Sequence, residues 1–171
     1  MTNLADVVLN AVSPADATLL ANLLELYLHD LSEAFPAIEL GADGRFGYDY
    51  LPLYWSEPDR RFPFLIQSGG RVAGFVLAMR GSPMSDDPEV LDISEFFVLR
   101  HYRRSGVGRR AAFLVWDQLP GRWIVRVAEG NSGALAFWTG IVDEYSHGRA
   151  SVTSRPGTPS AWRVFSFDSR R

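Results

Sequence analysis

The sequence contains neither cysteine nor lysine, so all 17 of its basic residues are arginines. Without cysteine there is no disulfide framework, no cysteine-ligated zinc and no thiol nucleophile. Without lysine there is no Schiff-base chemistry and no Walker-A phosphate loop, which depends on its lysine. The three histidines, His29, His101 and His147, are too scattered to indicate a metal triad. We therefore expect no metal site, although these absences do not by themselves identify a function.

The sequence also lacks a large excess of charge of either sign, and it lacks long apolar runs. The 171 residues carry a formal net charge of -3, whereas a nucleic-acid-binding protein usually presents a basic face. No apolar run approaches the ~20 residues that span a bilayer, and residues 1–6 lack the basic start of a signal peptide. We expect a soluble, cytoplasmic protein that binds neither nucleic acid nor membrane. Its length predicts one domain over residues 1–171.

Hydrophobic periodicity predicts an α/β (α+β) fold. An apolar run at 6–12 predicts a strand, and a Ser-Pro-Ala-Asp start at 13–16 predicts a helix whose leucines recur every three or four residues. Two apolar runs joined by a Gly-Gly turn, 62–67 and 71–79, are typical of a β-hairpin. Further strands are expected at 90–99, 123–128, 143–151 and 161–167, and helices at 109–119 and 132–139. This order predicts a single mixed, mostly antiparallel sheet flanked by helices.

Residues 34–63 lose this periodicity. Glycines and prolines there alternate with aromatic residues, among them Tyr48, Tyr54 and Trp55. A long loop in a compact domain is often a lid or the wall of a pocket. Alternatively, the rings simply cover the core, and the sequence leaves both interpretations open.

The stretch 91–110 carries the clearest chemical pattern. An apolar strand leads through a polar link into residues 103–108 (RRSGVG), which open a helix. Helix amino termini present unpaired N–H groups and the positive end of the helix dipole, so they favour anions. Gly106 and Gly108 lack a Cβ, which lets a pyrophosphate approach the main chain. Five of the 17 arginines lie between positions 100 and 110, which also favours a phosphate-bearing cofactor.

Two classes of cofactor fit a glycine-rich strand-loop-helix. One is a dinucleotide, because the pattern Gly106-x-Gly108-x-x-Ala111 satisfies the Rossmann fingerprint and Glu129 follows about twenty residues later. In that motif, however, the glycines directly follow the strand, whereas here the polar stretch 100–105 intervenes and a hairpin precedes the unit. The other class is coenzyme A.

The same stretch resembles motif A of the GNAT superfamily of acetyl-CoA-dependent N-acetyltransferases, in which an apolar strand and a short polar link precede Arg/Gln-x-x-Gly-x-Gly/Ala. Residues 95–98 (EFFV), followed by Tyr-Arg at 102–103, are especially similar to polyamine-type members. A second block, residues 131–138 (NSGALAFW), is similar to the family pattern Asn-x-x-Ala-x-x-Phe-Tyr. The two blocks cover positions 90–140. They imply a GNAT-like acyl-CoA N-acyltransferase fold with a splayed central strand pair.

The resemblance also implies a co-substrate, acetyl-CoA, and the residues that would bind it. The main chain around Phe97 and Val98 would pair with pantetheine, and the Val98 N–H would stabilise the developing oxyanion. Asn131 would lie near the pantetheine arm. The residues whose loop would hold the pyrophosphate are Arg103, Arg104, Ser105, Gly106, Val107, Gly108 and Arg109.

Acetyl transfer to an amine requires that an ammonium lose a proton, which a nearby carboxylate can take. Glu95, inside the best-matching run, is the first candidate for this base, and Asp92 is the second. In a regular strand Asp92 shares a face with Phe96 and Val98, while Glu95 takes the other face. Members of the superfamily often bend or bulge this strand, which would change that assignment.

The sequence departs from the family where many members have a tyrosine that protonates the departing CoA thiolate. Trp138 occupies that place, and an indole is a poor acid. Tyr145 is the nearest downstream phenol and a candidate acid, although it can equally be a core tyrosine. A dedicated acid is not required, because thiols have pKa values near 8–9 and the thiolate is a tolerable leaving group.

The resemblance therefore implies an N-acetyltransferase that acts by direct attack in a ternary complex, since an acyl-cysteine route is excluded. A small cationic amine is the expected acceptor; a protein amine and an aminoglycoside-like compound are alternatives. The acidic residues that suggest a cation are Asp86, Asp87, Glu89, Asp92 and Glu95. A non-catalytic acyl-CoA-binding or regulatory module on the same fold is the rival interpretation, because of Trp138. The superfamily often forms homodimers, but the sequence identifies no interface.

Overall fold

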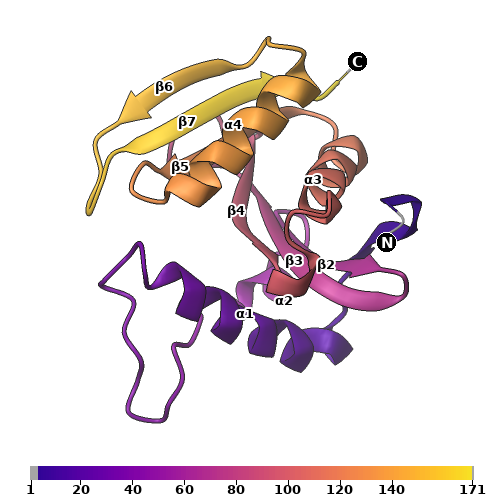
Figure 1. Ribbon diagram of the computed structural model, residues 1–171, viewed down its shortest axis with the longest axis vertical. Coiled ribbons are helices and arrows are strands. Elements are labelled where there is room, and N and C mark those ends of the chain that lie inside the picture. The colour runs from indigo at the N-terminus through magenta and orange to yellow at the C-terminus, as the bar shows by residue number, and fades with distance from the viewer. Residues whose placement is uncertain (1–3, 171) are drawn as a thin grey trace.

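A computed structural model describes residues 4–170, in which one seven-stranded sheet runs through the protein with helices on both faces (Figure 1). Residues 1–3 of the amino-terminal segment considered above lie outside the described part. The strand order is β1-β2-β3-β4-β5-β7-β6. The strands are β1 (Val7–Ala11), β2 (Arg61–Ser68), β3 (Arg71–Arg80), β4 (Leu91–Val98), β5 (Arg122–Ala128), β6 (Ser151–Arg155) and β7 (Trp162–Asp168). The helices are α1 (Ala17–Leu31), α2 (Leu53–Ser56), α3 (Val107–Gln118) and α4 (Ser132–Ser146), with short 3-10 turns at Leu4–Asp6, Pro14–Asp16 and Arg100–Tyr102.

The two larger hydrophobic cores of the described chain lie on opposite faces of this sheet. Leucines of α1 pack with Tyr54 of α2 against Phe75 and Phe97. On the other face, α3 and α4 contribute Trp116 and Trp138 to the larger core. Figure 1 shows α1 and the connection after it on one side of the molecule, and α4 with β6 and β7 on the other. The expected mixed sheet flanked by helices is thus confirmed, as is the hairpin of β2 and β3.

The centre of the sheet opens between β4 and β5. These parallel strands pair only at Leu91↔Trp123 and Asp92↔Ile124, after which β4 continues alone. β5 instead remains paired with β7 over its whole length. The central strand pair is therefore splayed, as the resemblance implied, and the last residues of β4 have no strand beside them on the β5 side.

A β-bulge at Ser94 changes the face assignment within β4. Leu77 of β3 pairs with Glu95 and Ala78 pairs with Ile93, so Ser94 is an extra residue in the ladder. Asp92 and Glu95 consequently share one face of the sheet instead of lying on opposite faces. Of the two arrangements left open by the sequence, the bulged strand is therefore the one present.

The carboxy-terminal part of the expected element order is also wrong in one place. The strand expected at 143–151 does not begin until Ser151, because α4 continues to Ser146 instead of ending near 139. Ile141 and Val142 are buried on the continued helix and extend its apolar face. The helix ends at His147, which adopts a left-handed conformation with φ 54°.

A test of the sheet geometry is available at Gly74, which pairs with Val98. A Cβ on Gly74 would lie 2.0 Å from the Phe97 carbonyl oxygen. We expect Gly74→Ala to destabilise the protein by roughly 3 kcal/mol, because main-chain atoms cannot move aside without disturbing the ladder. Gly140→Ala is the matched control: a Cβ there meets nothing within 4 Å on α4, and helix propensity predicts a gain of about 0.5–1 kcal/mol. Urea unfolding measures both, and a wild-type midpoint for Gly74→Ala would contradict this strand contact.

Candidate active site

Two adjoining cavities occupy the opening between β4 and β5. The inner cavity, of about 240 Å³, is lined by residues that include Glu95, Arg126 and Trp162. The outer cavity, of about 690 Å³, extends to the arginine-rich loop at the start of α3. Tyr27 and Trp138 line both cavities, which therefore form one continuous hollow.

Glu95 projects from the bulged part of β4 into the wall of the inner cavity. Its Oε2 accepts a hydrogen bond from the Tyr27 hydroxyl at 2.5 Å, and its Oε1 accepts one from the Tyr48 hydroxyl at 3.0 Å. Burial raises the pKa of Glu95 above its usual range, while the two tyrosine bonds and Arg126 oppose this shift. A carboxylate with a raised pKa is better suited to take a proton from an ammonium than an ordinary surface glutamate is.

The two tyrosines remain neutral donors to this carboxylate. Burial is the first cause that raises the pKa of Tyr27 and of Tyr48, and the charge of Glu95 raises both further. Tyr27 comes from α1, and Tyr48 comes from the aromatic connection that follows it. The carboxylate is thus held between two segments distant in sequence.

Glu25 of α1 fixes the connection that carries Tyr48. Its Oε2 accepts the Phe46 N–H at 2.7 Å and its Oε1 accepts the Gly47 N–H at 3.0 Å. Arg45 adds an ion pair at 3.6 Å. Both interpretations of the 34–63 segment therefore apply, since Phe35 and Ile38 line the inner cavity while Tyr54 is buried in the core.

Asp92, the second candidate base, lies behind the cavity wall. Its side chain is fully buried, and its Oδ2 accepts hydrogen bonds from Ser82 Oγ at 2.5 Å and Arg126 Nε at 3.2 Å. Burial raises the pKa of Asp92, and Arg126 and Ser82 counteract part of that shift. Within residues 4–170, Glu95 lines the inner cavity and Asp92 lines neither cavity.

The arginine-rich loop has the backbone shape of an anion site. Gly106, the residue before α3, has φ +85°, and Arg104 has φ +60°. The first N–H groups of α3 have no carbonyl partner within the helix and form the positive end of its dipole. Arg104 lines the outer cavity, and within the described chain it has no acidic partner. The expected cofactor residues that line this cavity are Phe97, Val98, Arg103, Arg104, Gly106, Gly108, Arg109 and Asn131.

The two remaining loop residues take other positions. The Ser105 hydroxyl donates to the Tyr102 carbonyl at 2.7 Å, and the Val107 side chain is buried in the larger core. Asn131 caps α4, because its Oδ1 accepts the Ala134 N–H at 3.1 Å. The same residue also lines both cavities.

The free edge of β4 offers main-chain groups to the outer cavity. The Leu99 N–H donates to the Ala73 carbonyl at 2.8 Å, so the alternation of an antiparallel ladder turns the N–H of Val98 away from β3. That side is the one from which β5 has diverged. The Val98 carbonyl faces the same way and accepts a hydrogen bond from Arg103 Nε at 2.7 Å.

Asp30 links α1 to the arginine-rich loop. It accepts hydrogen bonds from Arg100 at 2.6 Å and Arg103 at 2.5 Å. Partial burial acts against ionisation, but the two arginine bonds outweigh it and lower the pKa of Asp30. Arg109 pairs with Glu144 of α4 in the same way. Much of the positive charge in the loop is therefore matched by carboxylates of neighbouring helices.

The comparisons with known proteins agree with this geometry. A family model described as "Acetyltransferase (GNAT) family" matches residues 21–140. The chain belongs to the GNAT acetyltransferase family. The match includes most of α1 and of α4, together with the aromatic connection, β4, the arginine-rich loop and β5. These segments and the residues that join them supply every lining residue of the two cavities except Trp162. No curated protein matches the sequence.

Solved structures share the fold of this GNAT protein at low sequence identity. An acetyltransferase from Thermus thermophilus is 21% identical, with a TM-score of 0.66 and coverage of 98% of this chain and 99% of that one. Spermidine N-acetyltransferase from Vibrio cholerae, in complex with CoA and spermine, is 12% identical, with a TM-score of 0.67 and 96% coverage of both chains. The ribosomal-protein-S18-alanine N-acetyltransferase from Escherichia coli is 14% identical, with a TM-score of 0.61 and coverage of 96% and 95%.

Tyr145 of this GNAT protein lies apart from the hollow. Its hydroxyl donates to Asp117 at 2.8 Å, and its ring packs against Trp116 with ring centroids 4.7 Å apart. Among the residues described, Tyr145 is absent from the lining of both cavities, whereas Trp138 belongs to both. The phenol in the lining is that of Tyr27, which the sequence does not distinguish from the other apolar-face residues of α1.

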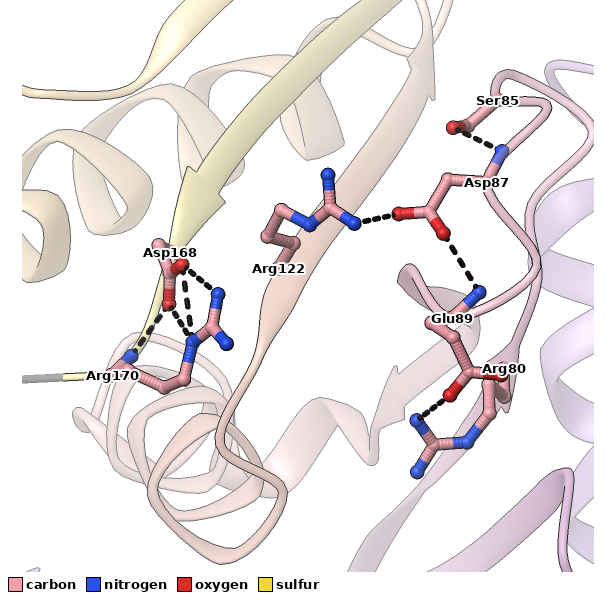
Figure 2. Close-up of polar contacts among 7 residues, drawn as sticks. All are labelled: Arg80, Ser85, Asp87, Glu89, Arg122, Asp168 and Arg170. Atoms are coloured by element: carbon pink, nitrogen blue, oxygen red, sulfur yellow. Dashed lines mark hydrogen bonds and ion pairs between the residues drawn. The ribbon is translucent and has the colours of Figure 1, made fainter.

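The acidic residues near β4 lie in different environments. Asp87 pairs with Arg122, and Glu89 pairs with Arg80 at 3.1 Å (Figure 2). Asp86 is exposed in the loop before β4. Of the acidic group expected to attract a cation, only Glu95 reaches the inner cavity.

The described chain contains neither a metal-binding cluster nor a membrane-spanning helix. No group of three or more histidine, aspartate or glutamate side chains between residues 4 and 170 could hold a metal ion. No helix in that part is long and apolar enough to cross a membrane.

The Glu25 contacts give a prediction that requires no ligand. Glu25→Ala removes the acceptors of the Phe46 and Gly47 N–H groups, so these amides should exchange with deuterium about tenfold faster or more. Glu39→Ala, at an exposed position of the same connection, is the control and should leave both rates unchanged. Equal rates in Glu25→Ala and the wild type would show that this contact does not hold the connection.

Proposed function

We propose that this GNAT protein transfers the acetyl group of acetyl-CoA to the primary amine of a small acceptor by direct attack in a ternary complex. The observation that carries the proposal is the position of Glu95, which lines a small cavity continuous with the arginine-rich outer cavity. The amine would enter as an ammonium. Of the acidic residues from which the sequence predicts a cationic acceptor, Glu95 alone lines the described cavities.

The residues present fit acetyl-CoA. The first N–H groups of α3 and Arg104 suit the pyrophosphate, and the free edge of β4 suits the amide groups of the pantetheine arm. When bound, acetyl-CoA supplies an acetyl group activated as a thioester. The Val98 N–H, turned away from β3, would stabilise negative charge on the acetyl oxygen.

Glu95 would act as the base. Its raised pKa and its position in the inner cavity support removal of a proton from the ammonium. The Tyr27 and Tyr48 hydroxyls would keep the carboxylate oriented and partly stabilise its charge.

In this proposal no side chain protonates the departing thiolate. Trp138 stands at the family position for a tyrosine, and Tyr145 is bonded to Asp117 away from the hollow. A thiol pKa near 8–9 lets the thiolate leave near neutral pH and take its proton from water.

The size of the inner cavity favours a small acceptor. Among the structural neighbours, one acts on spermidine and another on an alanine of a ribosomal protein, so the shared fold serves amines of very different size. The inner cavity of about 240 Å³ is smaller than the ~300–1,000 Å³ of pockets for drug-sized ligands.

A turnover assay tests the proposal. Acetyl-CoA with a panel of small amines should release free thiol, and Glu95→Gln should lower kcat/KM about 100-fold, since it removes the base. Glu89→Gln, at a carboxylate paired with Arg80 away from the cavities, should retain wild-type activity. Tight CoA binding by calorimetry without thiol release for any amine would instead support the non-catalytic acyl-CoA-binding module, which Trp138 favours.

The tyrosine bonds to Glu95 predict a pH effect with a definite sign. A hydrogen bond donated to a carboxylate stabilises its charged form, so Tyr48→Phe should raise the Glu95 pKa. The base is active when deprotonated, and the acidic limb of the kcat/KM profile should therefore move to higher pH. Tyr50→Phe is the control, because Tyr50 contacts the Tyr48 ring but is itself largely exposed. An unshifted limb in Tyr48→Phe would remove Glu95 from the base role.

A further inference from the structure

One charged pair at the hollow has no role in the proposed acetyl transfer. It consists of Arg126 on β5 and of Asp92, which lies behind it. Arg126 lines the inner cavity together with Glu95. Its Nε donates to Asp92 Oδ2 at 3.2 Å. Within residues 4–170, the two terminal Nη groups of Arg126 have no hydrogen-bond partner. A guanidinium therefore enters the wall of the cavity with four of its five N–H donors unused.

Asp92 explains how this guanidinium is held. The carboxylate is fully buried and is fixed from another direction by Ser82 Oγ at 2.5 Å. A buried ion pair is weak evidence for stability, because an apolar pair of similar volume often serves as well. An acid that engages only the Nε of Arg126 does, however, orient the guanidinium plane and leave its other edge available. Asp92 is thus a positioning residue for Arg126.

Aromatic rings enclose the same part of the inner cavity. The Arg126 Cζ lies 5.8 Å from the centroid of the Trp162 ring. Trp162 in turn stacks with Phe35, which follows α1, at a centroid distance of 5.9 Å and an interplanar angle of 30°. Both rings line the cavity. Charge interactions are stronger in such a partly dehydrated, aromatic environment than in bulk water.

We propose that Arg126 binds a carboxylate of the acceptor, which makes the acceptor class a small amine that carries a carboxylate, such as a free amino acid. This inference rests on the proposed function. A planar guanidinium with two free Nη donors matches a carboxylate in bidentate geometry. The amine end of the same molecule lies toward Glu95, which lines the same cavity of about 240 Å³. A polyamine would instead bring a second ammonium toward Arg126, which repels it.

Pairs of acceptors that differ only in the carboxylate test the inference. We compare kcat/KM of thiol release for leucine and leucinamide, and for methionine and methioninamide. The amide has the lower amine pKa, so a preference for the acid cannot arise from easier deprotonation. The wild type should prefer the acid by about tenfold or more, through its KM. Equal or better use of the amides, or of spermidine, would overturn the inference while thiol release itself would uphold the proposed function.

Variants of Arg126 locate the effect. Arg126→Gln should lower the acid-to-amide ratio of kcat/KM at least tenfold, and Asp92→Asn should lower it in the same direction by raising the KM for the acid. Arg163→Gln is the matched control, since Arg163 pairs with Glu129 and lies outside both cavity linings in the described chain. Its ratio should equal that of the wild type. An unchanged ratio in Arg126→Gln would overturn the inference.

Two measurements keep the test valid if Arg126→Gln fails to fold. Arg126→Lys keeps a positive charge beside Asp92 but lacks the planar fork, and it should still lose most of the preference for the acid. Calorimetry of leucine and leucinamide binding to the wild-type protein with CoA provides a readout that does not depend on turnover. Tighter binding of leucine supports the inference, and equal binding overturns it.

Discussion

β4 and β5 run side by side for two paired positions and then separate, and this separation is the constraint on which the rest of the site depends. β4 remains paired with β3 and β5 remains paired with β7, so the two halves of the sheet diverge from this point. The unpaired main-chain groups of β4 would be unfavourable in a closed core, but here they border the outer cavity. The opening also gives Glu95 and Arg126, which lie on diverging strands, a common space. The binding surface that we propose is thus an unpaired sheet edge in the middle of the protein.

Burial of charge is the second condition that shapes this hollow. Glu95 is kept in an environment that raises its pKa, and two neutral phenols supply the hydrogen bonds that water would otherwise provide. Asp92 is buried even more completely, and a guanidinium and a hydroxyl compensate it. The two carboxylates lie on one strand and one face, but their hydrogen-bond partners differ: two tyrosine hydroxyls bond Glu95, whereas an arginine and a serine hydroxyl bond Asp92. The chemistry of each acid is set by its partners.

Local patterns in the sequence were sufficient to predict the arginine-rich loop and to indicate the family. The glycines and arginines of 103–109 predict a loop that opens a helix, and the structure has α3 begin at Val107. The prediction of a strand at 143–151 was wrong because Ile141 and Val142 suit either a strand or the buried face of a helix. Only tertiary packing decides between these two structures. Tyr27 and Arg126 were not predicted as site residues, and Tyr48 was predicted only as part of a possible pocket wall, for another reason. Each enters the site through contacts between segments far apart in the chain, which no local pattern records.

The bulge at Ser94 makes the length of β4 as important as its composition. Side chains on a strand alternate between faces, so the single extra residue decides on which side of the sheet every later residue of β4 emerges. Insertion of one further residue there would turn Glu95 to the face opposite Asp92 without changing either side chain. Deletion of Ser94 would instead leave the two acids two positions apart and on one face of a regular strand. Among relatives of this protein, substitutions within β4 should therefore be tolerated more readily than insertions.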